Sequence, residues 1–325
     1  MFNKNFIGQL KNQLIDLLNT YFSYLDFYNV FSSPICINNI SNNNIKNISL
    51  LLNLNTKKKI FLQTSPELCM KNFLLFMYKN LFQIAYVYRN KERSTVHLPA
   101  FLMLEWYRFN NNSLQCIIND FFYILKEFTD YCNEMLSKNI KNSKFKLNGI
   151  NCKFRYYNIK DLWKKYAKID LHECLDALYS KKPYHLRSLL TKKGHNIPQN
   201  FSFNDTFFYM MSYHILPKIK FQSYIILDWP SIYSLCSKYY IDNNLFSERF
   251  EIYINGVEIA NGCYEKLSSS EQNISSPGIS STNGSALNLL SNLNHVSGGA
   301  VGVDRLLSSV LNINTIKNTE IITTL

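Results

Sequence analysis

The segment Tyr88–Arg108, YRNKERSTVHLPAFLMLEWYR, constrains the fold more than any other part of the 325-residue sequence. An apolar strand pattern ends in it, a polar loop follows over Lys91–His97, and a second strand pattern occupies Phe101–Arg108. Successive side chains of a strand point to opposite faces. One face of the second strand is therefore expected to carry Phe101, Met103, Glu105 and Tyr107. A carboxylate and a phenol among large apolar residues indicate either a hairpin with one solvent-exposed face or a binding site.

A helix is predicted shortly before this hairpin, in the sequence that follows QTSPE. Ser65 is expected as its N-cap and Pro66 as its first helical residue. Glu67 would then lie at the positive end of the helix dipole. Helical spacing of apolar residues predicts two longer helices, over 6–25 and 113–139.

The C-terminal third returns to strand patterns. The segment RFEIYINGVEIANGCYEKL, residues 249–267, predicts a second hairpin whose two-residue turn is Asn255-Gly256. The later segment GGAVGVDRLLSSVL predicts a glycine-rich strand that leads into a helix. Between these two segments, residues 268–292 are rich in Ser, Asn and Gly and are predicted to form a mobile loop.

The order of these elements predicts an α+β fold in which an antiparallel sheet is flanked by helices. We expect one domain over residues 1–325, with a poorly patterned insert of short helices and Lys-rich loops at about 140–220. The sequence lacks the G-x-G-x-x-G fingerprint with its acidic partner and the Walker lysine motif. Both common nucleotide-binding folds are therefore disfavoured.

Composition limits the class of protein without identifying it. A formal net charge of +12 suggests an anionic partner, but the longest basic run, Lys57–Lys59, is expected in a solvated loop. The eight cysteines are scattered without a C-x-x-C pair, which argues against a zinc site and a disulfide framework. The sequence shows no signal-peptide pattern and no run of about 18 apolar residues. We therefore expect a cytoplasmic protein with no membrane span.

Three groups of side chains are candidates for chemistry. Arg89 lies at the start of the hairpin loop and His97 near its end, and Arg305 offers a second forked cation for a phosphate. Glu105 and Tyr107 can hold an ammonium group. Two further carboxylates, Glu258 and Glu265, can bind Mg²⁺ or an amine. They fall on opposite faces of a flat strand unless Ala260-Asn261-Gly262 forms a bulge, and each of these two carboxylates could also simply face solvent.

Four blocks carry a resemblance to a known family: TSPE at 64–67, the hairpin from FQIAYVYRN to LMLEWYR, GVEIANGCYE and GVDRLL. They resemble the catalytic domain of class II lysyl-tRNA synthetases. They resemble more closely the elongation factor P–(R)-β-lysine ligases, which are short paralogues of those synthetases. The closer resemblance rests on the motif LMLEWYR and on Ala300. The resemblance covers most of the chain and is poor over 140–220 and 268–292. It implies a class II catalytic domain with no anticodon-binding domain.

The resemblance also implies a reaction. The family activates a lysine-type amino acid with ATP and Mg²⁺ as an aminoacyl adenylate and releases pyrophosphate. The ligases then transfer the acyl group to a lysine side chain of elongation factor P, so tRNA is not the expected acceptor. The segment SSPI around Pro34 resembles the motif that forms the family's homodimer interface. No Ser/His/Asp or Cys/His arrangement is visible, and adenylation requires none, because the substrate carboxylate is the nucleophile.

The site residues are carried over from the family motifs. The amino-acid site is implied to contain Ser65, Pro66, Glu67, Glu105, Tyr107 and Glu265. The ATP site is implied to contain Arg89, Asn90, Lys91, His97, Leu98, Phe101, Glu258, Ile259, Gly302 and Arg305. Among these, Arg89 and Arg305 are the expected catalytic cations. The expected Mg²⁺ ligands are Glu258 and Glu265.

Three residues of the hairpin depart from the family pattern. Lys91 and Ala100 stand where the family has Glu, and Leu98 stands where it has an ATP-contacting Asn. Two alternatives therefore remain beside the ligase: a truncated lysyl-tRNA synthetase-like enzyme with an RNA acceptor, and a degenerate, non-catalytic paralogue. A basic RNA-binding protein is supported by net charge alone.

Overall fold

The computed structural model describes residues 3–37, 46–53, 57–90, 94–111, 113–139, 153–220, 223–234, 237–240, 243–265 and 295–319. Lys91 and the expected loop at 268–292 lie outside the described residues. The chain divides into two compact units, one formed by residues 1–151 and 259–325 and the other by residues 152–258. The second unit takes in most of the expected insert and continues to Glu258.

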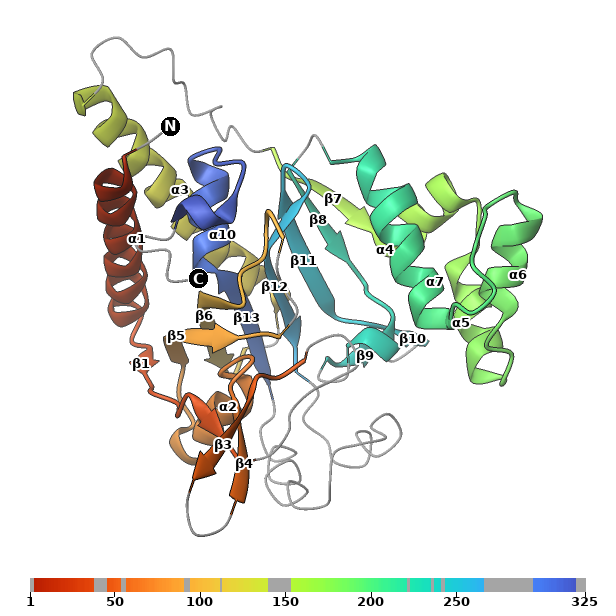
Figure 1. The fold of residues 1–325 in the computed structure, drawn as a ribbon, viewed down its shortest axis with the longest axis horizontal. Helices are drawn as coiled ribbons and strands as arrows, with labels where there is room; N and C mark the ends of the chain where they lie inside the picture. The colour runs from red at the N-terminus through yellow and green to blue at the C-terminus, as the bar shows by residue number, and fades with distance from the viewer. Residues whose placement is uncertain are drawn as a thin grey trace. The chain divides into compact units, whose positions relative to one another are not determined.

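The first unit contains the helices and strands that the sequence predicted around the hairpin (Figure 1). Its helices are α1 (Lys4–Tyr24), α2 (Glu67–Met77), α3 (Leu114–Asn139), α10 (Val303–Val310) and the short 3₁₀ helix η5 (Ile316–Thr319). Its strands are β1 (Tyr28–Asn29), β2 (Ile35–Cys36), β3 (Ser49–Asn53), β4 (Lys57–Leu62), β5 (Leu81–Tyr88), β6 (Ala100–Phe109), β12 (Val257–Tyr264, in this unit from Ile259) and β13 (Val296–Gly302).

The main sheet of this unit is largely antiparallel. Its strands are ordered β1-β5-β6-β13-β12, and only the short β1 runs parallel to its neighbour β5. The predicted hairpin is β5–β6, paired from Leu81 opposite Tyr107 to Tyr88 opposite Ala100. A smaller antiparallel sheet has the order β2-β4-β3. Because Lys57–Lys59 lies in β4, the expectation of a solvated loop there was wrong.

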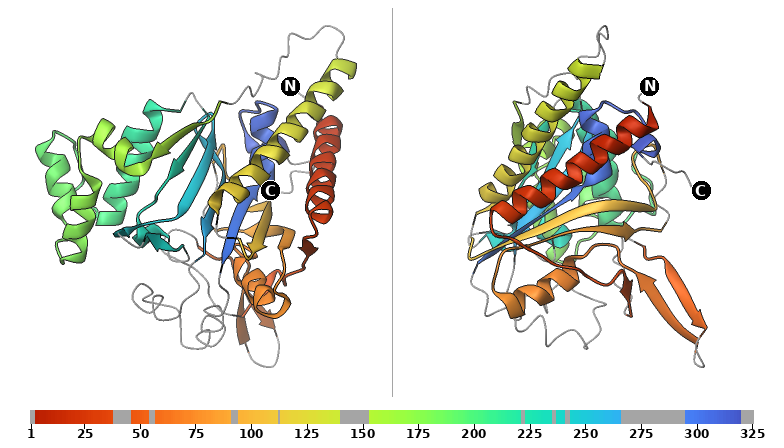
Figure 2. Two further views of the ribbon diagram at one scale, coloured as in Figure 1. Left: turned by 180° about the vertical axis from the view of Figure 1, so that it is seen from behind. Right: turned by 90° about the vertical axis from the view of Figure 1, so that its left-hand side faces the viewer.

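Strand β6 is buried on both faces, so the alternative of a hairpin with one solvent-exposed face is excluded. On one face Trp106 is fully buried and contacts Phe22 of α1, with ring centroids 5.6 Å apart. On the other face Tyr107 packs into an apolar cluster with Met70 and Leu74 of α2. Figure 2 shows α1 and α3 together on one side of the β5–β6 strands and α2 on the other. The predicted alternation is confirmed: Trp106 lies on one face of β6, where its Nε1 donates to the buried Asp120 at 3.0 Å, and Glu105 and Tyr107 lie on the other.

Helix α2 begins one residue later than expected, at Glu67, and Pro66 occupies the N-cap position without a side-chain hydrogen bond. Ser65 nevertheless satisfies a backbone donor of the first turn, because its Oγ accepts from the Glu67 N–H at 3.0 Å. The left-handed residue Tyr78 (φ 51°) ends the helix. The N-terminal end of α2 is thereby fixed next to the middle of β6.

The second unit is mainly helical, as the short helices predicted for the expected insert suggested. Its helices are α4 (Ile159–Leu162), α5 (Leu171–Tyr179), α6 (His185–Lys192), α7 (Phe203–Met210), the π-helical segments η1 (Trp163–Ala167) and η2 (Met211–Ile215), and the 3₁₀ segments η3 (Leu216–Lys218) and η4 (Ser231–Tyr233). Its strands are β7 (Arg155–Asn158), β8 (Tyr224–Leu227), β9 (Tyr239–Tyr240), β10 (Asn243–Ser247) and β11 (Arg249–Ile254). An aromatic core that includes Trp163 stacked on Phe207 holds these elements together.

The predicted Asn255-Gly256 turn is confirmed. Both residues have positive φ, 51° and 79°, as a two-residue hairpin turn of this type requires. Strand β12 then pairs with β13 without a register shift from Ala260 to Tyr264, so the bulge considered at Ala260-Asn261-Gly262 does not form. No helix in the described ranges combines the length and the hydrophobicity that a membrane span requires.

Candidate active site

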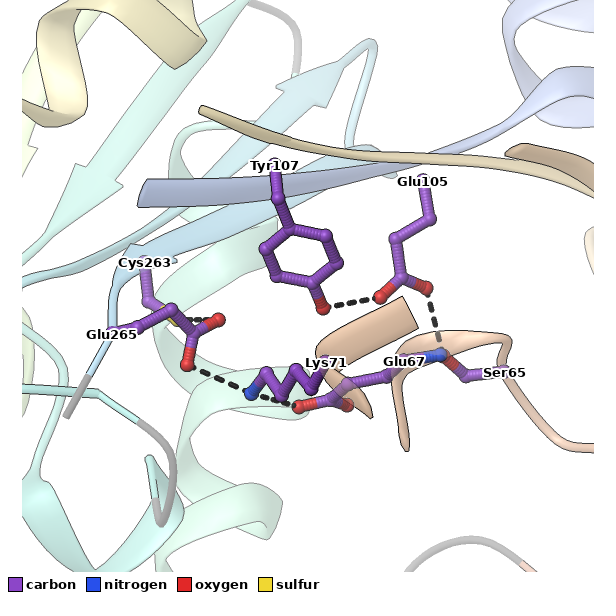
Figure 3. Close-up of polar contacts among 7 residues, drawn as sticks. All are labelled: Ser65, Glu67, Lys71, Glu105, Tyr107, Cys263 and Glu265. Carbon is purple, nitrogen blue, oxygen red and sulfur yellow. Dashed lines mark hydrogen bonds and ion pairs between the residues drawn. The ribbon is translucent and has the colours of Figure 1, made fainter. Parts of the chain in front are cut away.

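Glu105 on β6 is the centre of a polar network in the first unit (Figure 3). The Ser65 hydroxyl donates to Glu105 Oε2 at 2.8 Å, and the Tyr107 hydroxyl donates to Glu105 Oε1 at 2.5 Å. Both glutamate oxygens are thus held by neutral donors, and the side chain is buried. The predicted placement of Glu105 and Tyr107 on one face of β6 is confirmed, and Ser65 joins them from the residues just before α2.

A second group of charges lies beside this network. Lys71 Nζ, on α2, is 2.7 Å from Glu67 Oε1 and 2.7 Å from Glu265 Oε2. The Cys263 thiol lies 3.5 Å from the other oxygen of Glu265. Lys71 Nζ is also 5.9 Å from the centroid of the Tyr107 ring, which links the two groups. We call the following seven residues the carboxylate cluster: Ser65, Glu67, Lys71, Glu105, Tyr107, Cys263 and Glu265.

Burial controls the protonation of the cluster. It raises the pKa of Glu105 to about 8, with the nearby Glu67 carboxylate acting in the same direction and Tyr107, Ser65 and Lys71 opposing it. Burial also raises the pKa of Glu265, and the Lys71 ammonium opposes that shift. The pKa of Tyr107 lies well above its ordinary value, chiefly because of burial, so its hydroxyl remains a hydrogen-bond donor. An arriving ammonium group would lower the Glu105 pKa and form a charge-assisted pair in a largely dry site.

Two glycines of β13 make room for large side chains, Gly298 on the face of the carboxylate cluster and Gly299 on the opposite face. Gly298 lies opposite Tyr107 in the ladder, and a Cβ there would come within 2.4 Å of the tyrosine ring. Gly299 lies opposite Trp106, and a Cβ there would come within 2.6 Å of Ile117. Ala300 is the ladder partner of Glu105, so its methyl group lies on the same face as that carboxylate. Ala300, one of the residues on which the resemblance rests, is therefore next to the central carboxylate of the cluster.

We predict that Gly298→Ala destabilises the protein by about 1–3 kcal/mol, because the new methyl group must displace the Tyr107 ring. The free energy of unfolding from urea titration is the measurement. Gly302→Ala, in the same strand, is the matched control, because its Cβ would meet only Arg305 at an ordinary 3.6 Å. Equal stability of the two variants would contradict the prediction.

One expected phosphate-binding cation, Arg89, lies at the start of the hairpin loop, and the other, Arg305 on α10, contacts that loop. The Arg89 guanidinium lies 5.2 Å from the centroid of the Phe101 ring, and its Nε donates to the Thr64 carbonyl at 3.3 Å. Thr64 immediately precedes Ser65, so this contact connects Arg89 to the carboxylate cluster. Arg305 Nε donates to the Val96 carbonyl at 3.1 Å. Arg89, Phe101 and Arg305 therefore all contact the β5–β6 hairpin or its loop.

The other residues implied for the ATP site have mixed environments. Asn90 is held by its backbone, which donates to the Lys46 carbonyl at 2.7 Å, and His97 Nδ1 lies 2.7 Å from Ser94 Oγ. Leu98 and Ile259 are buried. Pro66, in the amino-acid triplet, supplies no side-chain hydrogen bond. Glu258 belongs to the second unit and is half-buried, and Gly302 precedes α10.

The Mg²⁺ expectation rests on Glu258 and Glu265. Glu265 is bonded to Lys71 and Cys263 in the first unit, whereas Glu258 belongs to the second unit. Within the described ranges, no three His, Cys, Asp or Glu side chains form a group arranged to hold a metal. The described part of the chain therefore contains no metal site built from protein side chains alone, and Mg²⁺ remains a prediction that involves the phosphates of ATP.

Sequence reasoning missed Lys71 and Asp304. Lys71 follows Glu67 by four residues on a predicted helix, and this spacing is a signal of a helical ion pair. Asp304 is buried; it pairs with Lys11 Nζ at 2.5 Å and accepts the Leu102 N–H at 2.9 Å. Asp304 thereby connects α10, the helix that carries Arg305, to both α1 and β6. No local pattern reveals these partners, because they lie more than 200 residues away in the sequence.

Comparison with known proteins gives a consistent result. A family model described as tRNA synthetases class II (D, K and N) matches residues 3–322. An elongation factor P–(R)-β-lysine ligase of Buchnera aphidicola subsp. Acyrthosiphon pisum (strain APS) is 29% identical over 269 residues, 78% of this chain and 74% of the relative. The ligase of that name from Pasteurella multocida (strain Pm70) is 26% identical, covering 66% of this chain and 58% of its own. A lysine–tRNA ligase of Buchnera aphidicola subsp. Cinara cedri (strain Cc) is 28% identical, covering 80% of this chain and 52% of its own.

Proposed function

The chain belongs to the class II tRNA synthetase family of the D, K and N enzymes, and from that premise we propose that it activates (R)-β-lysine, or lysine, with ATP and transfers it to a lysine side chain of elongation factor P. Family membership makes it an aminoacyl-adenylate-forming ligase that uses ATP. The amino acid, the acceptor, a homodimeric state and a cytoplasmic location belong to the proposal, as does a single catalytic domain with an insert at about 140–220.

The observation that carries the proposal is the carboxylate cluster. Glu105 is buried between two neutral donors, and Glu67 and Glu265 lie beside it. Buried carboxylates are costly to ionise unless a cation pairs with them. A lysine-type substrate carries two ammonium groups and can supply such cations. The cluster therefore favours a diamino acid over an amino acid with a neutral or acidic side chain.

The first step of the proposed reaction forms the adenylate. A substrate carboxylate oxygen attacks the α-phosphorus of ATP, the bond from that phosphorus to the bridging oxygen breaks, and pyrophosphate leaves. Arg89 and Arg305 are proposed to neutralise the negative charge that develops on the phosphates. Mg²⁺ bound with ATP would supply further charge neutralisation. The protein needs no nucleophile of its own, and its contribution is positioning and electrostatics.

The second step transfers the acyl group. The neutral ε-amine of the acceptor lysine attacks the acyl carbon, an amide bond forms, and AMP leaves with the electrons of the acyl–phosphate bond. The attacking amine loses one proton to solvent or buffer. Elongation factor P is favoured as acceptor by the names of the relatives reported above.

Mass spectrometry of the acceptor tests this proposal. Elongation factor P incubated with the protein, ATP, (R)-β-lysine and tRNA is expected to gain one β-lysyl group on a single lysine, and the tRNA is expected to stay unacylated. Elongation factor P with that lysine changed to arginine is the control and should gain nothing. An unmodified acceptor together with acylated tRNA would reject the proposed acceptor and favour the synthetase-like alternative, which the lysine–tRNA ligase relative supports.

A further inference from the structure

Lys71 is a cation of the protein itself within a group of side chains expected to receive the substrate's cations. Its side chain is 9% exposed, and its Nζ bridges Glu67 and Glu265 at 2.7 Å each. Glu67 begins α2 and Glu265 follows β12, so the bridge joins two elements that are almost 200 residues apart in sequence. Both carboxylates are implied substrate contacts, and Lys71 is the group that fixes their positions relative to each other.

The charges of the cluster can be compared with those of the substrate. When ionised, Glu67, Glu105 and Glu265 carry three negative charges, and Lys71 compensates one of them. Two negative charges are left for the substrate. A lysine isomer has two ammonium groups, and its carboxylate is consumed in the reaction with ATP. The two negative charges of the cluster that Lys71 does not compensate therefore match the two positive charges of a diammonium substrate.

We propose that Lys71 is a positioning residue that bridges Glu67 and Glu265 and sets the charge of the carboxylate cluster to that of a diammonium substrate. This inference rests on the proposed function for its substrate. Lys71 contacts Glu67 and Glu265, the carboxylates proposed to bind the substrate's ammonium groups, and takes no part in the bond-making steps. Its loss leaves Glu265, whose side chain is only 5% exposed, without the Lys71 cation, and frees Glu67 to adopt other rotamers.

The main test compares Lys71→Gln with Lys126→Gln in ATP–pyrophosphate exchange. Glutamine nearly matches the length of lysine and retains hydrogen bonding. Lys126 is the control because it is exposed on α3, and its ion pairs among the described residues are with Glu127 and Asp130 of the same helix. Lys71→Gln is expected to raise the KM for the amino acid about 10- to 100-fold while the KM for ATP stays unchanged. Lys71→Arg retains the cation and is expected to restore most of the affinity. A Lys71→Gln enzyme with a normal amino-acid KM, or with both KM values raised equally, would overturn the proposal.

A binding experiment separates this inference from the proposed function. The probe is 1,5-diaminopentane, which has two ammonium groups and no carboxylate, and titration calorimetry measures its affinity. The wild-type protein is expected to bind it about 10- to 100-fold more tightly than Lys71→Gln, because without the bridge Glu67 and Glu265 no longer hold the positions that receive the ammonium groups, and this loss outweighs the removal of one repelling cation. Binding without exchange on any lysine isomer would reject the proposed function and keep the inference. No binding to the wild type, or equal binding to both proteins, would reject the inference.

If Lys71→Gln does not fold, the shorter Lys71→Ala variant tests the bridging role of Lys71 instead. Propylammonium is expected to occupy the space left by the lysine and to raise the melting temperature of this variant. Tetramethylammonium at the same concentration, which cannot donate hydrogen bonds to the two carboxylates, is the control. Equal melting temperatures in the two salts would show that no bridging cation is needed and would overturn the proposal.

Discussion

Replacement of Glu105 by glutamine is expected to raise the KM for the lysine-type substrate roughly 30-fold to several-thousand-fold, corresponding to about 2–5 kcal/mol for the loss of one partner of a buried charge pair. Glutamine has nearly the same shape, and its single carbonyl oxygen can still accept from one of the two hydroxyls of Tyr107 and Ser65, while its NH2 group can donate to the oxygen of the other. The fold is therefore expected to persist, and the KM for ATP should change little. Steady-state exchange kinetics with each substrate varied in turn provide the measurement.

The same variant should also abolish a pH dependence. Glu105 in the free protein has its pKa raised to about 8, chiefly by burial, and a bound ammonium group requires the ionised form. The KM for the amino acid is therefore expected to fall about tenfold per pH unit between pH 6 and 8 and to level off above that range. Glu105→Gln should show no such slope. A wild-type KM that does not vary from pH 6 to 8 would rule out Glu105 as the ammonium partner.

The chain offers a matched control for this experiment. Glu251 on β11 is also buried, accepts from the tyrosine two residues later at 2.6 Å, and has its pKa raised to about 7 by burial. Its other described partner is Arg249 at 2.5 Å, in the second unit. Glu251→Gln should leave the slope of KM against pH as in the wild type.

The raised pKa of Glu105 also makes the free energy of unfolding depend on pH. The folded-state value of about 8 exceeds the ordinary value of 4.5, so the folded protein holds this proton more tightly than the unfolded chain. The resulting contribution to folding is complete below pH 4.5 and is lost as the pH rises through 8. Glu105→Gln is therefore expected to lose less stability than the wild type between pH 6 and 9, as measured by urea unfolding.

Loss of Arg89 is the second large effect that we expect. Arg89→Met should lower the kcat of exchange about 10²- to 10³-fold, because the phosphates lose a preorganised cation, while the KM for the amino acid should stay within a few-fold. Arg89→Lys retains a charge but lacks the fork, so it should recover only part of the rate.

Arg187→Met in the second unit is the control for Arg89. Arg187 has closely similar contacts, since it lies 4.6 Å from the Tyr184 ring centroid and donates to the Phe201 carbonyl at 3.3 Å. Its replacement should leave kcat unchanged. A normal kcat for Arg89→Met would contradict the role proposed for that residue.

Much of the site could be predicted because its signals are local in sequence. Period-two alternation on β6 placed Glu105 and Tyr107 on one face, and the Ser-Pro-Glu triplet predicted the start of α2 within one residue. The turn at Asn255-Gly256 followed from backbone preferences alone. Each of these features depends on contacts between residues close in the chain, which is why pattern reasoning found them.

The rest depended on contacts distant in sequence. The burial of both faces of β6 required α1, α2 and α3 to pack around it, and nothing in the strand itself specifies that. The Lys71–Glu265 bridge depends on where β12 ends relative to α2. Lys57–Lys59 was expected in a loop because of its charge, yet antiparallel pairing with Leu51–Asn53 of β3 makes this segment part of a strand.

The central claim is that the carboxylate cluster selects a lysine-type amino acid for activation by ATP. ATP–pyrophosphate exchange with (R)-β-lysine and α-lysine side by side, using the wild type and Glu105→Gln, tests it most directly. We predict exchange that depends on a lysine isomer, is fastest with (R)-β-lysine and is strongly reduced in the variant at pH 8. Absence of exchange with every lysine isomer, or equal exchange by the wild type and the variant, would contradict the claim.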